Sequence, residues 1–175
     1  IRSQITDDDY QNIELTEDGL QFANTIFKTN KTRNTPLAET YKPDMTEPLP
    51  PAVGLRSRFP IIKNQGQQGS CTAFSMVSVF EYFLMRLSGS YTDLSEAFTY
   101  FNSRKQAGNT EIDEGATFND VLKATIDSGL CVESLCPYDE HTYNVEPSEE
   151  SYADGSTRKV TEAKNVEINI QHIKC

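Results

Sequence analysis

Apolar residues recur with a helical period in three segments of the chain. In residues 71–87 they follow one another at intervals of three or four positions, which places them on one face of a helix. The residues that set this spacing are Phe74, Val77, Phe80 or Leu84, and Leu87. Gly89 comes next, and glycine commonly ends a helix. The pattern therefore predicts a helix from Cys71 to Leu87.

A second helix is predicted in the segment LSEAFTYFNSRKQAG, residues 94–108. Ser95 is a suitable N-cap, because its hydroxyl can accept a hydrogen bond from an unpaired N–H of the first turn. Phe98 and Phe101 are expected to point inward. Gly108 is the expected stop.

A third helix is predicted in TFNDVLKATIDSG, between Thr117 as the N-cap and Gly129 as the stop. The residues expected on its core side are Val121, Leu122, Thr125 and Ile126. Strand signals are scarce. NVEINI (165–170) predicts a short strand, and QHIK (171–174) predicts the start of another helix. The chain is therefore expected to be a mostly helical lobe.

Composition narrows the classes of function. The chain has 175 residues and a net charge of −10, and it is long enough for one domain with a buried core. It has no long basic stretch, which argues against nucleic acid or an anionic membrane surface as its main partner. It also has no run of about 18 apolar residues, so no membrane span is expected.

The first fifty or so residues differ in composition from the rest. Residues 1–20 are acidic, and residues 36–51 hold five of the eight prolines, which is typical of an extended, linker-like segment. We therefore expect residues 1–48 to be an arm or a pro-segment and residues 49–175 to be the packed lobe. A disordered acidic tail is the alternative for residues 1–48.

Candidate chemistry lies in NQGQQGSCTAF, residues 64–74, where one cysteine follows two glycine turns. Ser70 is a suitable N-cap, so Cys71 is expected in the first turn of the helix. The unpaired N–H groups at a helix start favour a thiolate, the reactive form of cysteine. The N–H of Cys71 and the amide of Gln65 could together hold an oxyanion. A small buried cysteine beside a surface glutamine is the alternative.

The other cysteines and the two histidines carry a weaker signal. Cys131, Cys136 and Cys175 bring the number of cysteines to four, which allows two disulfides without indicating their pairing. Their spacing from His141 and His172 is poor for a set of metal ligands, so no metal and no cofactor are expected. Cys131 and Cys136 are interpreted as core or loop residues.

The segment IKNQGQQGSCTAFS resembles the active-site segment of the papain-like cysteine peptidases. The resemblance places Cys71 at the nucleophile and Gln65 at the glutamine of the oxyanion hole. LPPAVGLRSRFP resembles the start of the mature enzyme, and LSEAFTYFNSR the helix after the active-site helix. The similarity covers residues 49–175. It implies an α+β papain-like fold, of which this chain holds the mainly helical left lobe.

A further segment, DEGATFNDVLKATIDSGLCVESLCPY, resembles the stretch that lines the non-primed side of the substrate cleft. Gly115 matches the glycine whose backbone pairs with the substrate main chain, as an added strand would. Asp113 and Glu114 match the two positions before it. The resemblance implies that these three residues, together with Gly69 and Ser70 before the nucleophile, bind substrate.

The chain departs from the family at three positions. Gln68 stands where a cysteine usually precedes the nucleophile by three residues, so the usual disulfide cannot form. Thr72 replaces an aromatic residue, and Glu114 replaces a glycine. The first two changes resemble the DQGQLGSCTA variety of some bacterial and viral members. Tyr138 is expected to pack beneath the cleft in a structural role.

The family's catalytic histidine lies about 130–150 residues beyond the nucleophile. Counted from Cys71, it falls at about position 201 or later, and neither His141 nor His172 matches it. The β-rich right lobe is therefore expected to be absent from this chain. A complementary C-terminal histidine-bearing lobe, from the same precursor or a second chain, is the expected partner.

The resemblance implies a cysteine endopeptidase, a hydrolase that cleaves peptide or protein substrates by thiol acyl transfer. Residues 1–48 would then be the inhibitory segment of a zymogen. The alternative is a catalytically inactive papain-like lobe that serves as a structural or interaction module. A secretory or lysosome-like compartment and a virion are both compatible with the sequence.

Overall fold

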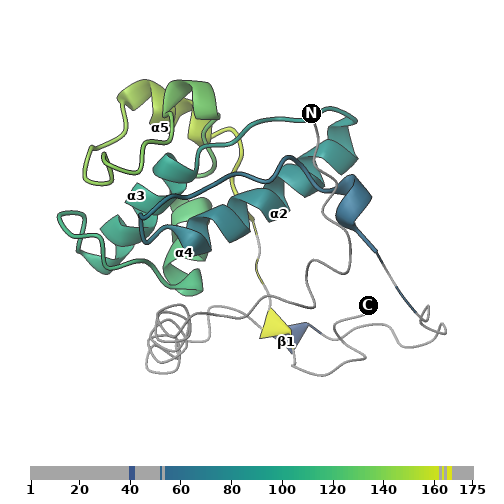
Figure 1. Ribbon diagram of the computed structural model, residues 1–175, viewed down its shortest axis with the longest axis horizontal. Coiled ribbons are helices and arrows are strands. Elements are labelled where there is room, and N and C mark those ends of the chain that lie inside the picture. The colour runs from purple at the N-terminus through teal and green to yellow at the C-terminus, as the bar shows by residue number, and fades with distance from the viewer. Residues whose placement is uncertain (1–39, 42–51, 53, 162, 164, 167–175) are drawn as a thin grey trace. The chain divides into compact units, whose positions relative to one another are not determined.

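The computed structural model describes residues 40–41, 52, 54–161, 163 and 165–166. All of them belong to one unit, residues 35–175. The helix predicted at 171–174, residues 167–170 of the predicted strand and most of the predicted arm lie outside the described residues. The described part is mainly helical (Figure 1), as the sequence predicts.

Helix α2, Cys71–Ser88, begins at the predicted residue and ends one residue later than predicted. Gly89 stops it in the left-handed conformation, with φ 74°, and donates its N–H to the carbonyl of Met85. The buried residues of α2 are Thr72, Ala73, Val77, Glu81 and Tyr82. Leu87, which its spacing places on the apolar face, lies in the last turn of α2 and is 85% exposed.

Helix α3, Glu96–Ala107, also starts and ends as predicted. The Ser95 hydroxyl caps it by accepting a hydrogen bond from the N–H of Phe98 at 2.9 Å. Gly108 ends it with φ 76°. Phe98 and Phe101 are both buried, so the predicted inward face is confirmed.

Helix α4, Phe118–Asp127, begins with a capping box in which Thr117 and Asp120 each accept the other's backbone N–H. Gly129 follows with φ 82°, and a Cβ there would lie 1.9 Å from the carbonyl oxygen of Gly155. Both its conformation and its surroundings therefore require glycine. Of the predicted core residues, Val121 and Thr125 are buried, and Leu122 and Ile126 are half-buried.

Helix α5, Glu149–Gly155, was not predicted, because its segment is short and acidic and lacks an apolar period. The hydroxyl of Ser148 caps it by accepting the N–H of Ser151 at 3.2 Å. The acidic first turn also favours a helix start, because carboxylates stabilise the positive end of the helix dipole. Two short 3₁₀ helices, η2 (Arg56–Arg58) and η3 (Glu133–Leu135), are also present.

One strand pair is described. Strand β1, Thr40–Tyr41, pairs in parallel with β2, Asn165–Val166. Strand β2 begins at the first residue of the predicted strand, so that start is confirmed. The pairing attaches two residues of the predicted arm to the segment after α5.

Helix α3 packs against α2 and α4, and α2 also contacts α4 (Figure 1). Val77, Leu94 and Leu130 form a buried apolar cluster. Leu94 also forms an isolated antiparallel bridge with Val132, which ties the segment before α3 to the segment after α4. These contacts fix the position of α2, the helix that begins with Cys71.

An ionic cluster centred on Lys63 lies within the same helical unit. The ammonium of Lys63 lies 3.0 Å from a carboxylate oxygen of Glu81, 2.6 Å from Asp93 and 2.9 Å from Glu96. It also donates to the carbonyl of Leu94 at 3.0 Å. The side chains of Glu81 and Glu96 are each 1% exposed, so their charges depend on Lys63 for compensation.

The Lys63 cluster predicts an unusual pH dependence of stability. Burial raises the pKa of Glu96 from 4.5 to about 7, and the hydrogen bond and charge of Lys63 offset this only in part. Between pH 4.5 and about pH 7, Glu96 keeps its proton in the folded state and has lost it in the unfolded state. The stability of the fold therefore falls as the pH rises through this range. We expect this group to lower the free energy of unfolding by about 2 kcal/mol across the window.

Urea unfolding at pH 5 and pH 7 measures this effect. Glu96→Gln should remove the fall in stability, whereas Glu146→Gln, at an exposed carboxylate, should retain it. The same pH dependence in the wild type and in Glu96→Gln would contradict the assignment.

Candidate active site

Cys71, the first residue of α2, is half-buried. Burial raises the pKa of its thiol, and hydrogen bonds from the backbone N–H groups of Thr72 and of Cys71 itself lower it by less. The net pKa of Cys71 is therefore above its ordinary value. The helix start does supply donors to the sulfur, as predicted, but in this lobe alone burial outweighs them and the thiol is protonated at neutral pH.

Ser70 occupies the predicted N-cap position, but its side chain does not cap α2. Its hydroxyl lies 2.8 Å from the hydroxyl of Tyr138 instead, and the residue is fully buried. The predicted cap is therefore wrong, although the helix begins where the cap would place it. A tertiary hydrogen bond has replaced the local one.

Tyr138 anchors the loop that leads into α2, which we define as residues 64–70 and call the pre-α2 loop. Its hydroxyl group donates to the carbonyl of Gln65 at 2.8 Å, and the oxygen of the same hydroxyl can accept a hydrogen bond from the Ser70 hydroxyl. Its ring packs edge-on against Phe74, with ring centroids 4.8 Å apart. Its own N–H donates to Glu133 at 2.7 Å. These contacts agree with the structural role expected for Tyr138.

Replacing Tyr138 with phenylalanine should lower the free energy of unfolding by about 1–3 kcal/mol, because the change leaves the buried hydroxyl of Ser70 without its partner. Urea unfolding of the chain measures this loss. Tyr143→Phe is the matched control, because the described contacts of Tyr143 are made by its ring, whose centroid lies 5.2 Å from the guanidinium carbon of Arg104, and by its carbonyl, and phenylalanine keeps both. Equal stabilities of the two variants would contradict the anchoring role.

The carbonyl of Gln68 positions Gln65. The Nε2 of Gln65 donates to it at 2.9 Å, and the N–H of Ser70 donates to it at 2.8 Å. A side-chain amide carries two N–H groups, so the bond to Gln68 leaves the second one for another acceptor. Gln65 is thus held in the same loop that leads into Cys71.

Three of the residues predicted to bind substrate lie together. Both carboxylate oxygens of Asp113 accept the N–H of Gly69, at 3.1 and 3.0 Å. Tyr100 donates its hydroxyl hydrogen to Asp113, and its oxygen accepts the N–H of Gly115 at 3.2 Å. The carboxylate of Asp113 therefore braces the pre-α2 loop. The sequence did not reveal this contact, nor the part that Tyr100 plays in it.

The segment around Gly115 is held beside the start of α2. Gly115 has φ 80°, a conformation that favours glycine, and a Cβ on it would lie 3.4 Å from the carbonyl oxygen of Gly69. Thr72 donates its hydroxyl hydrogen to the carbonyl of Ala116 at 3.0 Å. Glu114 is exposed. The structure therefore brings Gly115 close to Gly69, whereas the side chain of Glu114 faces solvent.

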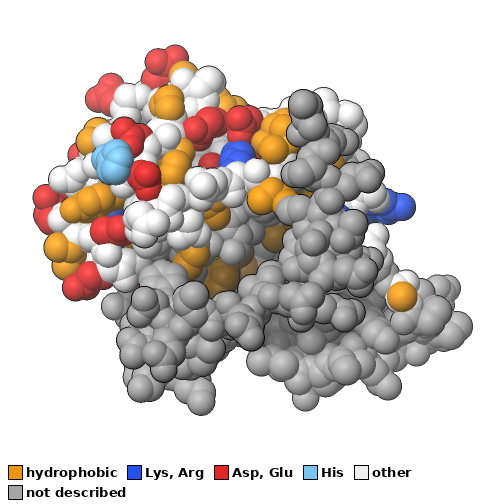
Figure 2. All heavy atoms as spheres, viewed as in Figure 1, with side chains coloured by type: hydrophobic (Ala, Val, Ile, Leu, Met, Phe, Trp, Pro, Cys, Tyr) orange, Lys and Arg blue, Asp and Glu red, His pale blue; other side chains and the backbone are white. Residues whose placement is uncertain are grey.

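The other thiols and the described histidine show no comparable arrangement. Within the described residues, Cys131 and Cys136 are free thiols, buried and half-buried respectively. The side chain of His141 is 84% exposed and appears in pale blue at the surface in Figure 2. Cys175 and His172 lie outside the described residues.

No group of three or more histidine, cysteine, aspartate or glutamate residues in the described part of the chain is placed to hold a metal ion. None of the helices described has the length and apolar character needed to cross a membrane.

The sequence profile of papain family cysteine proteases matches residues 49–174, most of the chain. The chain belongs to this family. Its structure is similar to that of xylellain, a cysteine protease from Xylella fastidiosa, with a TM-score of 0.71 and 29% sequence identity. That similarity covers 78% of this chain and 57% of the xylellain chain. The papain-like fold expected from the sequence is thus confirmed, with its mainly helical lobe in the described residues.

Two curated relatives agree with the family. An uncharacterised peptidase C1-like protein of Acanthamoeba polyphaga mimivirus is 27% identical over 120 residues, which cover 63% of this chain and 39% of that protein. The oryzain beta chain of Oryza sativa subsp. japonica is 41% identical over 66 residues, which cover 37% of this chain and 14% of oryzain. The chain therefore spans less than half the length of these relatives.

Gln68 makes a non-covalent link at the position of the missing family disulfide. It is 4% exposed, and its Nε2 donates to the carbonyls of Asp139 and Glu140, at 3.5 and 3.2 Å. The N–H of Gln67 adds a hydrogen bond to the Glu140 carboxylate at 2.5 Å. This papain-family lobe thus connects its pre-α2 loop to residues 139–140 through hydrogen bonds.

Proposed function

We propose that the chain carries the nucleophile of a cysteine endopeptidase and that Cys71 attacks the scissile carbonyl. The observation that supports this most is the start of α2. There the N–H groups of Cys71 and Thr72 reach the sulfur, and Gln65 is fastened in the loop immediately before. A structural cysteine would need neither the donors nor the glutamine. Membership of the papain family supports the same reaction.

The proposed reaction is acyl transfer. The thiolate of Cys71 forms a bond to the carbonyl carbon, and the N–H of Cys71 and the amide of Gln65 hold the resulting oxyanion. A histidine protonates the leaving amine as the peptide bond breaks. Water, activated by the same histidine, then releases the acyl group and restores the thiol.

The proposed substrate is a peptide or protein chain. The backbone of Gly115 would pair with the substrate main chain, in the manner of an added strand. Gly69 and Asp113, which are hydrogen-bonded to each other beside it, would keep that backbone in place. Glu114 is exposed and would lie beside the cleft, and Ser70 would act through its position in the loop.

We also propose that a complementary histidine-bearing lobe activates Cys71. Burial keeps the pKa of Cys71 above its ordinary value in this lobe, so a base must remove the proton at neutral pH. The test compares hydrolysis of a fluorogenic peptide by the 175-residue chain and by a longer protein that includes the second lobe. We expect the shorter chain to be a poor catalyst. Turnover by it at the rate of an intact papain-like enzyme would contradict the proposal.

Residues 1–48 are proposed to be an inhibitory pro-segment. Deleting them should then increase the rate at which iodoacetamide alkylates Cys71, because the segment would no longer cover the thiol. Mass spectrometry of the labelled chain, with the adduct mapped to Cys71, measures the change. The rate at Cys136 in the same sample is the reference. An unchanged rate at Cys71 would count against a pro-segment and in favour of a simple acidic tail.

A further inference from the structure

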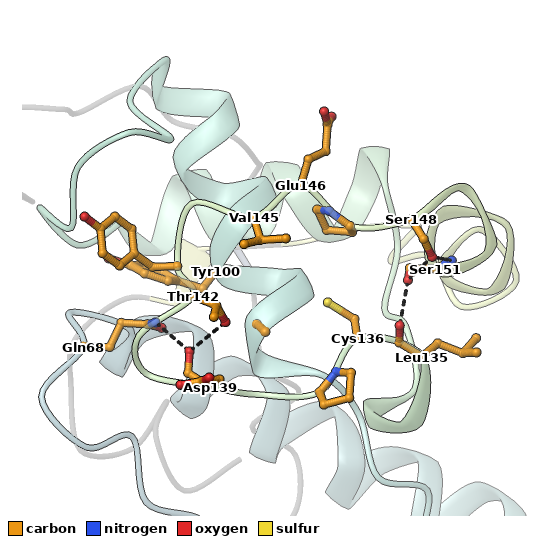
Figure 3. Close-up of a pocket in the computed structure, with 14 residues that line it drawn as sticks. Gln68, Tyr100, Leu135, Cys136, Asp139, Thr142, Val145, Glu146, Ser148 and Ser151 are labelled. Atoms are coloured by element: carbon orange, nitrogen blue, oxygen red, sulfur yellow. Dashed lines mark hydrogen bonds between the residues drawn. The ribbon is translucent and has the colours of Figure 1, made fainter.

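Tyr100, on helix α3, is a buried residue whose hydroxyl lies among the residues proposed to bind substrate. It is 0% exposed, and the centroid of its ring lies 4.3 Å from the guanidinium carbon of Arg104. The residue also borders a cavity of about 230 Å³, together with Gln68 and Cys136 (Figure 3). Truncation of Tyr100 to alanine would enlarge this cavity and destabilise the fold, so phenylalanine is the substitution that tests the hydroxyl alone.

The Tyr100 hydroxyl makes two hydrogen bonds that join separate segments of the chain. It donates to the carboxylate of Asp113, and its oxygen accepts the N–H of Gly115 at 3.2 Å. Burial and the hydrogen bond to Asp113 raise the pKa of Tyr100, so the hydroxyl keeps at neutral pH the proton that it donates. Asp113 in turn accepts the N–H of Gly69, two residues before Cys71. One buried hydroxyl therefore connects the backbone of Gly115 to the pre-α2 loop.

Arg104 holds the same segment one turn further along α3. Tyr100 and Arg104 are four residues apart, so they lie on the same face of the helix. Arg104 is 0% exposed, and its guanidinium donates to the carbonyls of Thr110 and Ile112, at 2.7 and 3.1 Å. Residues 110–115 are thus attached to α3 at two places, and the Tyr100 hydroxyl is the attachment that reaches Gly115.

We propose that Tyr100 is a positioning residue that places the backbone of Gly115 relative to Cys71, so that a peptide paired with Gly115 presents its scissile carbonyl to the thiol. This rests on the proposed function above, because it requires Gly115 to pair with substrate. The hydroxyl acts through Gly115 and Asp113 and not by contact with the substrate, since both of its hydrogen bonds are to these residues. A misplacement of about 1 Å can cost about 10²-fold in rate, so loss of this hydroxyl weakens productive binding of such peptides.

Tyr100→Phe tests the proposal, because it removes the hydroxyl and retains the ring beside Arg104. The assay uses the longer protein that includes the second lobe and two fluorogenic substrates with the same residue at the scissile bond. One substrate has three residues before that bond, enough main chain to pair with Gly115, and the other has one. We expect Tyr100→Phe to lower kcat/KM for the longer substrate about tenfold, mainly through a higher KM, and to change kcat/KM for the shorter one by less than about twofold.

Tyr152→Phe is the matched control. The Tyr152 hydroxyl donates to the side chain of Asn102 on α3 at 3.1 Å, so this variant also removes one hydrogen bond to α3 but leaves those of Gly115 and Asp113 in place. The ratio of the two kcat/KM values should equal that of the wild type. A smaller folded fraction lowers the rates for both substrates equally, so a loss of stability in either variant does not change this ratio.

An unchanged ratio of the two kcat/KM values in Tyr100→Phe would overturn the positioning role, whether or not the variant is less active overall. A change of the same size in Tyr152→Phe would also overturn it, because the effect would then not depend on Gly115. If the wild type hydrolysed neither substrate, the proposed function would fail, and the positioning role with it. A loss confined to the longer substrate in Tyr100→Phe, with an active wild type, would support both.

Discussion

Replacing Lys63 with methionine is expected to lower the free energy of unfolding of this chain by about 3–5 kcal/mol at pH 8, because it leaves buried carboxylates without their cation. Glu81 and Glu96 are each 1% exposed, so water cannot replace the ammonium. Methionine approximates the length of the lysine stem, which limits the loss of packing. Urea unfolding monitored by circular dichroism measures the change.

Lys105→Met is the matched control for Lys63→Met. Lys105 pairs with Glu146 at 2.8 Å, but the two side chains are 53% and 63% exposed, and such surface pairs contribute about 0–1 kcal/mol. The loss in Lys63→Met should also be smaller at pH 5, because burial raises the pKa of Glu96 to about 7 and a protonated Glu96 needs no cation. Equal losses in the two variants would show that the Lys63 cluster is no more important than a surface pair.

Replacing Cys71 with serine is expected to reduce peptide hydrolysis by the two-lobed protein by about 10³-fold or more. A serine hydroxyl is much harder to deprotonate than a thiol and is a weaker nucleophile at neutral pH. The fold should change little, because serine is slightly smaller than cysteine and the site is only half-buried. Measurements of kcat/KM together with urea unfolding separate lost chemistry from lost structure.

Ser88→Ala, at an exposed position in the last turn of the same helix, is the control for Cys71→Ser and should retain activity. Activity of Cys71→Ser within tenfold of the wild type would mean that another group is the nucleophile. If Cys71→Ser were also much less stable than the wild type, unfolding could account for the lost activity, and the kinetics would not identify Cys71 as the nucleophile.

The bounds of three helices could be predicted because their signals are local. Ser95 and Thr117 cap the helices that directly follow them, and Gly89 and Gly108 stop the helices that directly precede them. Each cap or stop acts within about one turn of its own helix, so no knowledge of the tertiary fold is needed.

The geometry around Cys71 could be predicted only in part, because its decisive contacts join distant residues. Asp113 reaches Gly69 across 44 positions, and Tyr138 reaches Ser70 across 68. No spacing rule applies at such separations, so the expected serine cap was wrong. The net direction of the thiol pKa shift at Cys71 could not be predicted either, because burial, which raises that pKa, follows from tertiary packing.

The pH dependence of Cys71 alkylation tests the central claim most directly. The measurement compares the 175-residue chain with a two-lobed protein, using iodoacetamide and a papain-type epoxide, with each adduct mapped by mass spectrometry. Cys131 and Cys136, whose thiol pKa values burial also raises, are internal references. In the 175-residue chain we expect an apparent pKa for Cys71 above the ordinary thiol value of about 8.5. In the two-lobed protein we expect a single epoxide adduct at Cys71 and an apparent pKa well below that value. No epoxide adduct at Cys71 in the two-lobed protein, or an ordinary thiol titration there, would contradict its assignment as the nucleophile.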